Sequence, residues 1–246
     1  MRLQTATWPE VENYLQRSDG IIVPIGSTEQ HGPNGMLGTD AICPETIAFG
    51  VADSIEVLVA PTLSIGQAHH HLGFPGTIAL RPSTMLALLV DVVRSLYRHG
   101  FRHIYFLNGH GGNVATVNTA FQEIYAQSSF GETALSDLRL KLCNWYMTES
   151  VGRISKELFG DQEGSHATPS EVSLTFYAYP EEVKSVPMSP ELAPVGSIRD
   201  ADDYRAHFAD GRIGSNPALA TVAAGERLFE ACVNDVVTDY AEFIST

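Results

Sequence analysis

The stretch IIVPIGSTEQHG, residues 21–32, joins a short apolar run to a polar loop. Its apolar part ends at Gly26, which is typical of a buried strand that stops in a glycine turn. Similar apolar runs predict three further strands, at residues 56–63, 103–107 and 138–145. The segments between these runs carry apolar residues at helical spacing, so strands and helices are expected to alternate along the chain.

Four long helices are predicted from this spacing: residues 41–54, Ser83 as the N-cap to Gly100, Asn113 as the N-cap onward, and residues 222–243. Strands separated by helices of this length favour a parallel sheet with helices on both faces. We therefore expect an α/β fold around a mostly parallel sheet. The Pro-, Gly- and Asp-rich segment 186–217 is predicted to run over the surface, since only one helix follows it.

The composition is that of a globular chain with an acidic surface. Of 246 residues 44% are hydrophobic and 18% charged, which supplies a core and argues against disorder. The net charge of −14 argues against nucleic acid or an anionic membrane as the main partner. We see no signal peptide and no apolar run of about 18 residues, and therefore expect a cytoplasmic protein.

The three cysteines are far apart and form no CxxC pair, so the sequence offers neither a zinc ribbon nor a redox dithiol. Core packing is predicted for Cys143 and Cys232. Nor does the chain contain a GxSxG elbow or a cysteine near a base, so a serine or cysteine hydrolase has no visible nucleophile.

A polar loop follows the first predicted strand and supplies Glu29, His31 and Asp40 within a short stretch. In an extended chain residues i and i+2 point the same way, so Glu29 and His31 can face one site. Carboxylate and imidazole groups together suit zinc, iron or manganese. The alternative is a polar turn whose charges meet water, but Gly and Pro restrict this loop on both sides, which favours metal ligands.

The sequence NGHGGN, residues 108–113, lies between the third predicted strand and the next helix. Its glycines let the backbone approach a ligand closely, and the helix behind it offers free N–H groups. The glycine spacing fits neither a P-loop nor a dinucleotide fingerprint. A ligand role for His110 is favoured over a buried, hydrogen-bonded histidine in a tight turn, since a histidine beside glycines at a strand end is a common ligand setting.

Two other stretches are open to more than one interpretation. In residues 163–171, spacing alone does not decide whether Glu171 and His166 belong to a site, or are a helix-dipole carboxylate and a surface histidine. Thr168 or Ser170 is expected to cap a short helix there. In the run His69–His71, three consecutive side chains cannot all converge on one ion, so one of them is expected to contact the site.

With these clusters identified, the sequence resembles the creatininase (creatinine amidohydrolase) family. The stretch PIGSTEQHGPNGMLGTDAICPETIA is similar to that family's first signature, P-x-G-[ST]-x-E-Q-H-G-x-H-L-P-x-x-T-D. Four further stretches match in the family's order: HLGFPGTIAL, FLNGHGGN, SHATPSEVS against HAGxxETS, and GRIGSNPALAT. Together these stretches span nearly the whole chain.

The resemblance implies a three-layer α/β/α sandwich formed by residues 1–246 as a single domain. It also implies a two-metal site, usually within a ring-like homo-hexamer. The metal ligands that it implies are Glu29, His31, Asp40, His110 and Glu171. Asp40 matches the bridging carboxylate, and His166 matches the histidine that handles protons. Glu171 is assigned because Gly112 stands where creatininase proper has a glutamate. The implied cofactors are two divalent ions per chain, with zinc expected first and manganese or iron as alternatives.

The implied function is hydrolysis of a C–N bond in a small-molecule amide, cyclic amide or formamide. A hydroxide held between two divalent ions would attack the carbonyl carbon, and His166 would deliver a proton to the leaving nitrogen. This mechanism needs no nucleophilic serine or cysteine. The family includes deformylases of pterin or flavin precursors and a peptidase, so creatinine is one option among several.

Departures from the family pattern keep two other hypotheses open. Asn34 replaces the usual His of the first signature, and Thr168 and Val172 replace the Gly and Thr of HAGxxETS. These changes motivate a non-catalytic, metal-stabilised small-molecule binding protein as the alternative. A nucleotide-dependent enzyme that uses NGHGGN as a phosphate cradle is less favoured, because no Lys or Arg lies nearby in the sequence.

Overall fold

A four-stranded parallel sheet forms the centre of the computed structural model, which describes residues 1–132 and 135–246. The strands are β1 (Gly20–Ile25), β2 (Leu58–Val59), β3 (His103–Asn108) and β4 (Arg139–Asn144), in the order β2-β1-β3-β4. All six residues of β1 are buried, as expected for a parallel strand covered on both faces. The predicted α/β fold is confirmed.

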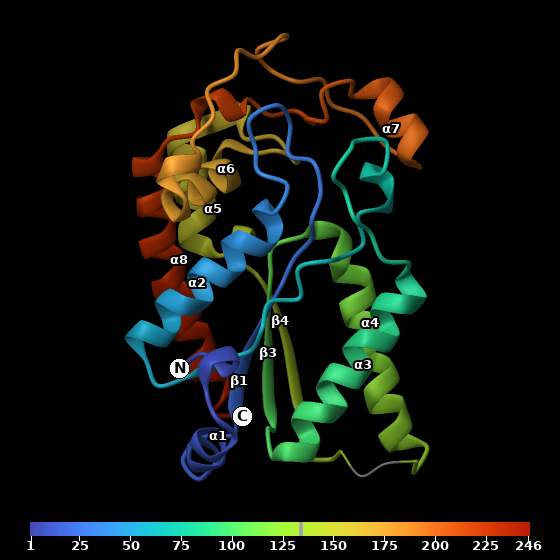
Figure 1. Cartoon of the computed structure of the whole chain (residues 1–246), viewed down its shortest axis with the longest axis vertical. Helices are drawn as coiled ribbons and strands as arrows, with labels where there is room; N and C mark the ends of the chain where they lie inside the picture. Colours follow the sequence, from blue (N-terminus) through green and yellow to red (C-terminus); the bar gives the residue numbers. More distant parts are fainter. Residues whose placement is uncertain (133–134) are drawn as a thin grey trace.

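Helices cover both faces of this sheet (Figure 1). One face packs against α3 (Pro82–His99) and α4 (Val114–Ser129), and the other against α2 (Thr39–Ser54), α5 (Glu149–Phe159), α6 (Pro169–Ala178) and α8 (Val222–Phe243). Alternate β1 residues point to opposite faces, with Ile22 in one apolar core and Val23 in the other. Among the described residues, no helix has the length and hydrophobicity that a membrane-spanning segment needs.

The strand register brings three loops to one edge of the sheet. Ile25 of β1 pairs with Asn108 of β3, which pairs with Asn144 of β4, so these strands end together. β1 lies between β2 and β3, so the loops that follow β1 and β3 begin beside each other where the strand order reverses. Open α/β sheets bind ligands at this kind of switch point.

Several predicted boundaries differ from the structure. The strand expected at 56–63 is reduced to β2: Ala60 N still donates to Ile22 O, but the next donor of the ladder belongs to Pro24 of β1, which has no N–H. The helix α3 begins at Pro82 after Arg81, so Ser83 is not its cap. Asn113 is the N-cap of α4, but its side chain bonds Gly26 O and Gln67 N instead of the helix.

Three helices were not predicted at all, α5 among them. α1 (Trp8–Leu15) packs its Tyr14 into the core on the α3 and α4 face. α7 (Ala201–His207) lies within the segment 186–217, where Asp200 caps it by accepting a hydrogen bond from Asp203 N. The side chain of Tyr204 in α7 is fully buried, so this segment does more than run over the surface.

The close packing of α6 against α8 depends on Gly225, because a Cβ there would collide with Ser173 O. Gly225→Ala is therefore expected to lower the free energy of unfolding by about 1–3 kcal/mol, the usual cost of overpacking. Gly152 in α5 is a matched control, since no described heavy atom lies within 4 Å of a Cβ built there. Gly152→Ala is expected to raise that free energy by about 0.5–1 kcal/mol through helix propensity. Urea denaturation measures both, and destabilisation of the two variants to the same extent would contradict this explanation.

Candidate metal centre

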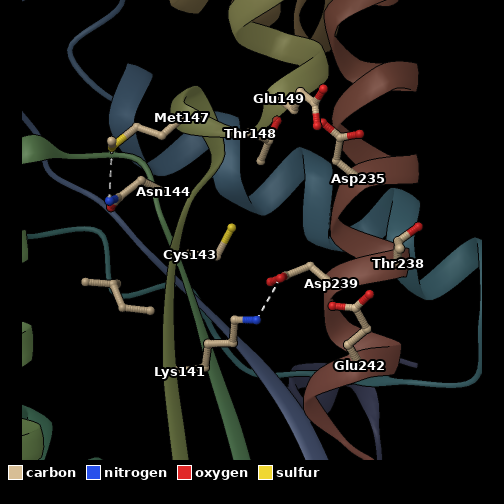
Figure 2. Close-up of a pocket in the computed structure, with 11 residues that line it drawn as sticks. Lys141, Cys143, Asn144, Met147, Thr148, Glu149, Asp235, Thr238, Asp239 and Glu242 are labelled. Atoms are coloured by element: carbon tan, nitrogen blue, oxygen red, sulfur yellow. Dashed lines mark hydrogen bonds and ion pairs between the residues drawn. The ribbon is translucent and has the colours of Figure 1, made fainter.

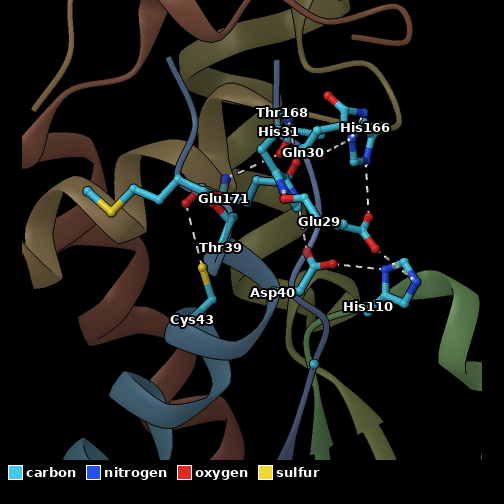
Figure 3. Close-up of polar contacts among 12 residues, drawn as sticks. Glu29, Gln30, His31, Thr39, Asp40, Cys43, His110, His166, Thr168 and Glu171 are labelled. Atoms are coloured by element: carbon cyan, nitrogen blue, oxygen red, sulfur yellow. Dashed lines mark hydrogen bonds and ion pairs between the residues drawn. The ribbon is translucent and has the colours of Figure 1, made fainter. Parts of the chain in front are cut away.

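Charged side chains from four segments meet where β1 and β3 end (Figure 3). Glu29 and His31 lie in the loop after β1, Asp40 in the first turn of α2, His110 in the turn after β3, and His166 ahead of α6. Glu29, His31 and Asp40 are 0%, 1% and 3% exposed. Ligand atoms of these three residues all lie within 4.8 Å of one another, as a shared site requires.

Asp40 lies between two imidazole rings. Its Oδ1 atom is 2.9 Å from His31 Nε2, and its Oδ2 atom is 2.9 Å from His110 Nδ1. Glu29 lies on the His110 side, with Oε2 3.4 Å from His110 Nε2. Its Oε1 atom is 3.8 Å from His166 Nδ1. The three side chains of His31, His110 and His166 thus surround two buried carboxylates.

Each of these three rings also has a nitrogen that contacts a backbone carbonyl. The contacts are His31 Nδ1 to Glu29 O at 3.1 Å, His110 Nε2 to Gln67 O at 3.1 Å, and His166 Nε2 to Gln30 O at 2.9 Å. A carbonyl oxygen only accepts, so that nitrogen carries the proton, and in the neutral ring the other nitrogen presents a lone pair to the carboxylates. Histidines that bind metals are held in this way.

The buried carboxylates are short of hydrogen-bond donors. Within the described residues, Glu29 Oε1, Glu29 Oε2 and Asp40 Oδ2 make no hydrogen bond. Burying such charges without compensation is costly, and imidazole lone pairs next to carboxylate oxygens repel them. A divalent cation among these atoms removes both penalties, and mixed imidazole and carboxylate ligands suit zinc, manganese or iron. The residues therefore fit a metal site.

The electrostatics of the cluster favour positive charge on His31 and His110, whereas burial and the neighbouring histidines lower the pKa of His166. Burial lowers the pKa of His31, but Asp40 and Glu171 outweigh it and raise the pKa to about 10. Burial is likewise outweighed at His110 by Glu29 and Asp40, which raise its pKa to about 9. Burial raises the pKa of Asp40, but the two histidines hold it well below its usual range. Protons and metal ions therefore compete for the same nitrogens.

The two carboxylate oxygens of Glu171 contact different partners, the start of α6 and His31. Its Oε1 accepts a 2.6 Å hydrogen bond from Thr168 N, and its own N–H donates to Thr168 Oγ1, which forms a capping box at the start of α6. Its Oε2 lies 3.9 Å from His31 Nε2, and burial raises the pKa of the carboxyl to about 7. The helix-cap and site interpretations, left open by the spacing, therefore both describe this residue.

The histidine run contributes one side chain to the cluster, as predicted. His71 is 2% exposed, and its Nε2 lies 3.1 Å from Glu29 Oε1, whereas His69 is exposed. The His71 ring packs against His166, with the ring centroids 4.5 Å apart, and against Tyr204 of α7. Sequence reasoning missed Gln30 and Tyr204, because only folding brings them to the histidines.

The late motif GRIGSNPALAT, a weak signal in the sequence, supports the site. Ser215 Oγ donates a 2.6 Å hydrogen bond to His166 O, and Ile213 pairs with His166 across an antiparallel bridge. Asn34, the departure from the first signature, is buried and donates to Pro217 O. Asn34 therefore ties the first motif to the last one, which weakens it as an argument for a non-catalytic protein.

A separate pocket of ≈ 500 Å³ lies between β4 and α8 (Figure 2). Lys141 and Asp239 form an ion pair of 2.7 Å in it, and Cys143 also lines it. None of the clustered residues described above lines this pocket. Cys143 is half-buried and Cys232 fully buried in or against the apolar core, as predicted.

Comparison with known proteins gives consistent matches over nearly the full chain. A family model described as creatinine amidohydrolase (creatininase) matches residues 4–239. The 3-dehydro-scyllo-inosose hydrolase of Thermotoga maritima is 29% identical over 261 residues, covering 97% of this chain and 80% of that protein. The mycofactocin precursor peptide peptidase of Mycolicibacterium smegmatis is 30% identical over 227 residues, covering 87% and 81%.

A solved structure described as creatininase with Mn superposes with a TM-score of 0.84. It is 25% identical in sequence, and the match covers 98% of both chains. The matched family and relatives are named for creatinine, an inosose and a precursor peptide, so similar chains act on different substrates.

Proposed function

Because the chain belongs to the creatininase family of amidohydrolases, we propose that it hydrolyses a C–N bond of a small amide, cyclic amide or formamide with two divalent metal ions. The observation that carries this proposal is the position of Asp40. Each of its oxygens lies 2.9 Å from a different imidazole nitrogen, and each ring is fixed from behind by a carbonyl. A carboxylate placed in this way can serve two ions at once.

The proposed ligands divide between the two sides of Asp40. Glu29 lies on the His110 side and Glu171 Oε2 on the His31 side. Bound divalent ions supply Lewis acidity, which polarises a carbonyl group and makes water a nucleophile near neutral pH. We expect zinc first, with manganese or iron as alternatives; the manganese of the matched creatininase supports such an ion.

His166 is proposed to move the proton. Its Nε2 is bonded to Gln30 O, so Nδ1 carries the free lone pair and faces the Glu29 carboxylate. A proton taken up at Nδ1 can be passed to the leaving nitrogen while the Nε2 bond keeps the ring in place. The hydrogen bond of Ser215 to His166 O holds the backbone during this transfer.

Steric contacts explain why the last glycine of NGHGGN, Gly112, carries no side chain. A Cβ at Gly112 would collide with His110 Nε2 and lie 2.8 Å from Gln67 O. Position 112, two residues after His110, therefore cannot carry a glutamate in this arrangement. This supports Glu171 as the source of the fifth ligand. A hexameric assembly, which the resemblance implies, and a cytoplasmic location both belong to this proposal.

Hydrolysis assays on creatinine, N-formyl amines and small cyclic amides test the proposal. We expect zinc- or manganese-loaded protein to cleave at least one of them, with activity lost on chelation and regained with metal. His166→Gln is expected to lower the rate about 10²–10⁴-fold, the usual contribution of a general acid or base. His207→Gln is the matched control, because this histidine is exposed on α7.

Two results would contradict the proposal. The first is hydrolysis that proceeds at full rate in chelator-treated protein, or equally in both histidine variants. The second is protein that binds metal but cleaves none of these C–N bonds, which would favour the non-catalytic binding protein.

A further inference from the structure

A fourth imidazole, His71, faces the Glu29 carboxylate, as His110 and His166 do, but is held differently. His31, His110 and His166 each have one nitrogen on a backbone carbonyl, which leaves a lone pair toward the cluster. The amide nitrogen of Gln30 lies 2.9 Å both from His166 Nε2 and from His71 Nδ1, but within the described residues no backbone carbonyl contacts His71 Nδ1. This difference changes what the ring presents to Glu29.

The orientation of the Gln30 amide is fixed by two backbone groups. Its Oε1 accepts a 2.9 Å hydrogen bond from Gly32 N, and its Nε2 donates to Gly211 O at 2.9 Å. A flipped amide would set two donors against each other at Gly32 and two acceptors at Gly211. Gln30 is 5% exposed, so water is not a ready substitute for these partners. The atom that faces His71 is therefore the NH₂ nitrogen.

The Gln30 NH₂ group only donates, and one of its two protons goes to Gly211 O. His166 Nε2 also lies 2.9 Å from this nitrogen, but its own proton is on Gln30 O, so it cannot accept the second one. His71 Nδ1 therefore accepts it. The single ring proton of the neutral imidazole then lies on Nε2, the atom 3.1 Å from Glu29 Oε1. The contact is outside standard hydrogen-bond geometry, so the N–H acts on the carboxylate mainly through electrostatic attraction. A nitrogen that carries a proton has no lone pair to give to a metal ion.

We propose that His71 is a positioning residue for Glu29, kept in its Nε2–H form by Gln30, and that it is not a metal ligand. Distance alone would suggest otherwise, since ligand atoms of Glu29, His71 and His166 lie within 4.8 Å of one another. The inference rests on the proposed function in one respect, because Glu29 matters here as a proposed ligand.

The proposed role follows from the two oxygens of Glu29. Attraction of Oε1 by the His71 N–H holds the carboxylate with Oε2 toward His110, 3.4 Å from its Nε2. The tilted packing of the His71 ring against both His166 and Tyr204 keeps it from turning away. Removal of such an outer partner typically weakens metal binding about 10–100-fold without removing a ligand.

The tautomer can be observed directly in protein labelled with ¹⁵N-histidine. A long-range ¹H–¹⁵N correlation spectrum distinguishes protonated from unprotonated ring nitrogens, and loss of signals in His71→Gln assigns the ring. We expect a protonated Nε2 and an unprotonated Nδ1 for His71 in both metal-free and zinc-loaded protein. An unprotonated Nε2, or a coordination shift of Nε2 on zinc loading, would overturn the inference.

Metal titration supplies a second readout. His71→Gln is expected to bind as many ions per chain as the wild type, with apparent Kd raised about 10–100-fold. His69→Gln makes the same substitution at an exposed neighbour and should leave Kd unchanged. Loss of one ion in His71→Gln, or a Kd equal to that of His69→Gln, would refute the positioning role. If the wild type binds no metal, the proposed function fails, while the metal-free spectrum still decides the His71 tautomer.

Discussion

Asp40→Asn is expected to strip the protein of bound metal and of hydrolytic activity. Asp40 is the carboxylate whose oxygens face both His31 and His110, so its loss weakens both halves of the proposed site. The loss of affinity should exceed the roughly 10–100-fold caused by removing an outer partner, because a ligand itself is lost. Equilibrium dialysis against zinc, followed by elemental mass spectrometry, measures the ions retained per chain.

Asp239→Asn is the matched control for this substitution. Asp239 is a partly buried, ion-paired aspartate that contacts Lys141 and Tyr105 between β4 and α8. Its replacement should leave the metal content at the wild-type level. Equal metal content in the Asp40 and Asp239 variants would show that Asp40 is not a ligand.

Arg212→Met is expected to give the largest loss of stability. Arg212 is 0% exposed, pairs with Asp210 at 2.8 Å, and donates to the carbonyls of Pro190, Glu191 and Ser215. Methionine fills part of the space but leaves these acceptors without donors. We expect a loss of about 3 kcal/mol, the order of cost of breaking a buried charged pair. For a chain of this length that corresponds to a Tm lower by roughly 6–12 °C.

The same substitution should also affect the site. Arg212 holds the following segment in place. In this segment Ile213 pairs with His166 and Ser215 Oγ donates to His166 O. Arg199→Met is the control, since this arginine is also ion-paired, to Asp203, but its side chain is 82% exposed. An exposed pair contributes about 0–1 kcal/mol. Thermal unfolding curves that coincide for the two variants would contradict the role assigned to Arg212.

Strong local patterns in the sequence were enough to predict the frame of the fold. The apolar run at β1 and the long stripe of α8 are buried where predicted, and α8 has the predicted bounds. The family resemblance is confirmed by a family model over residues 4–239. The short helices α1 and α7 escaped prediction because their stability comes from tertiary contacts, such as the burial of Tyr14 and Tyr204, and little from periodicity.

The site was predictable only in part, because several of its contacts join residues that are far apart in the sequence. Glu29, His31 and Asp40 are close in sequence, so their chemistry is visible before folding. The contacts that set ring orientation, such as Gln30 with His71, join residues 41 positions apart. The burial of Arg212 could not be predicted either, because apart from Asp210 its partners are backbone carbonyls, which any sequence provides.

The metal content of wild-type protein, purified without added metal or chelator, tests the proposed binuclear centre most directly. Elemental mass spectrometry combined with amino-acid analysis counts the ions per chain. We predict about two equivalents of zinc, manganese or iron, either as purified or after reconstitution. One equivalent that does not rise on reconstitution, or none at all, would contradict the assignment of Asp40 as a carboxylate shared by two ions.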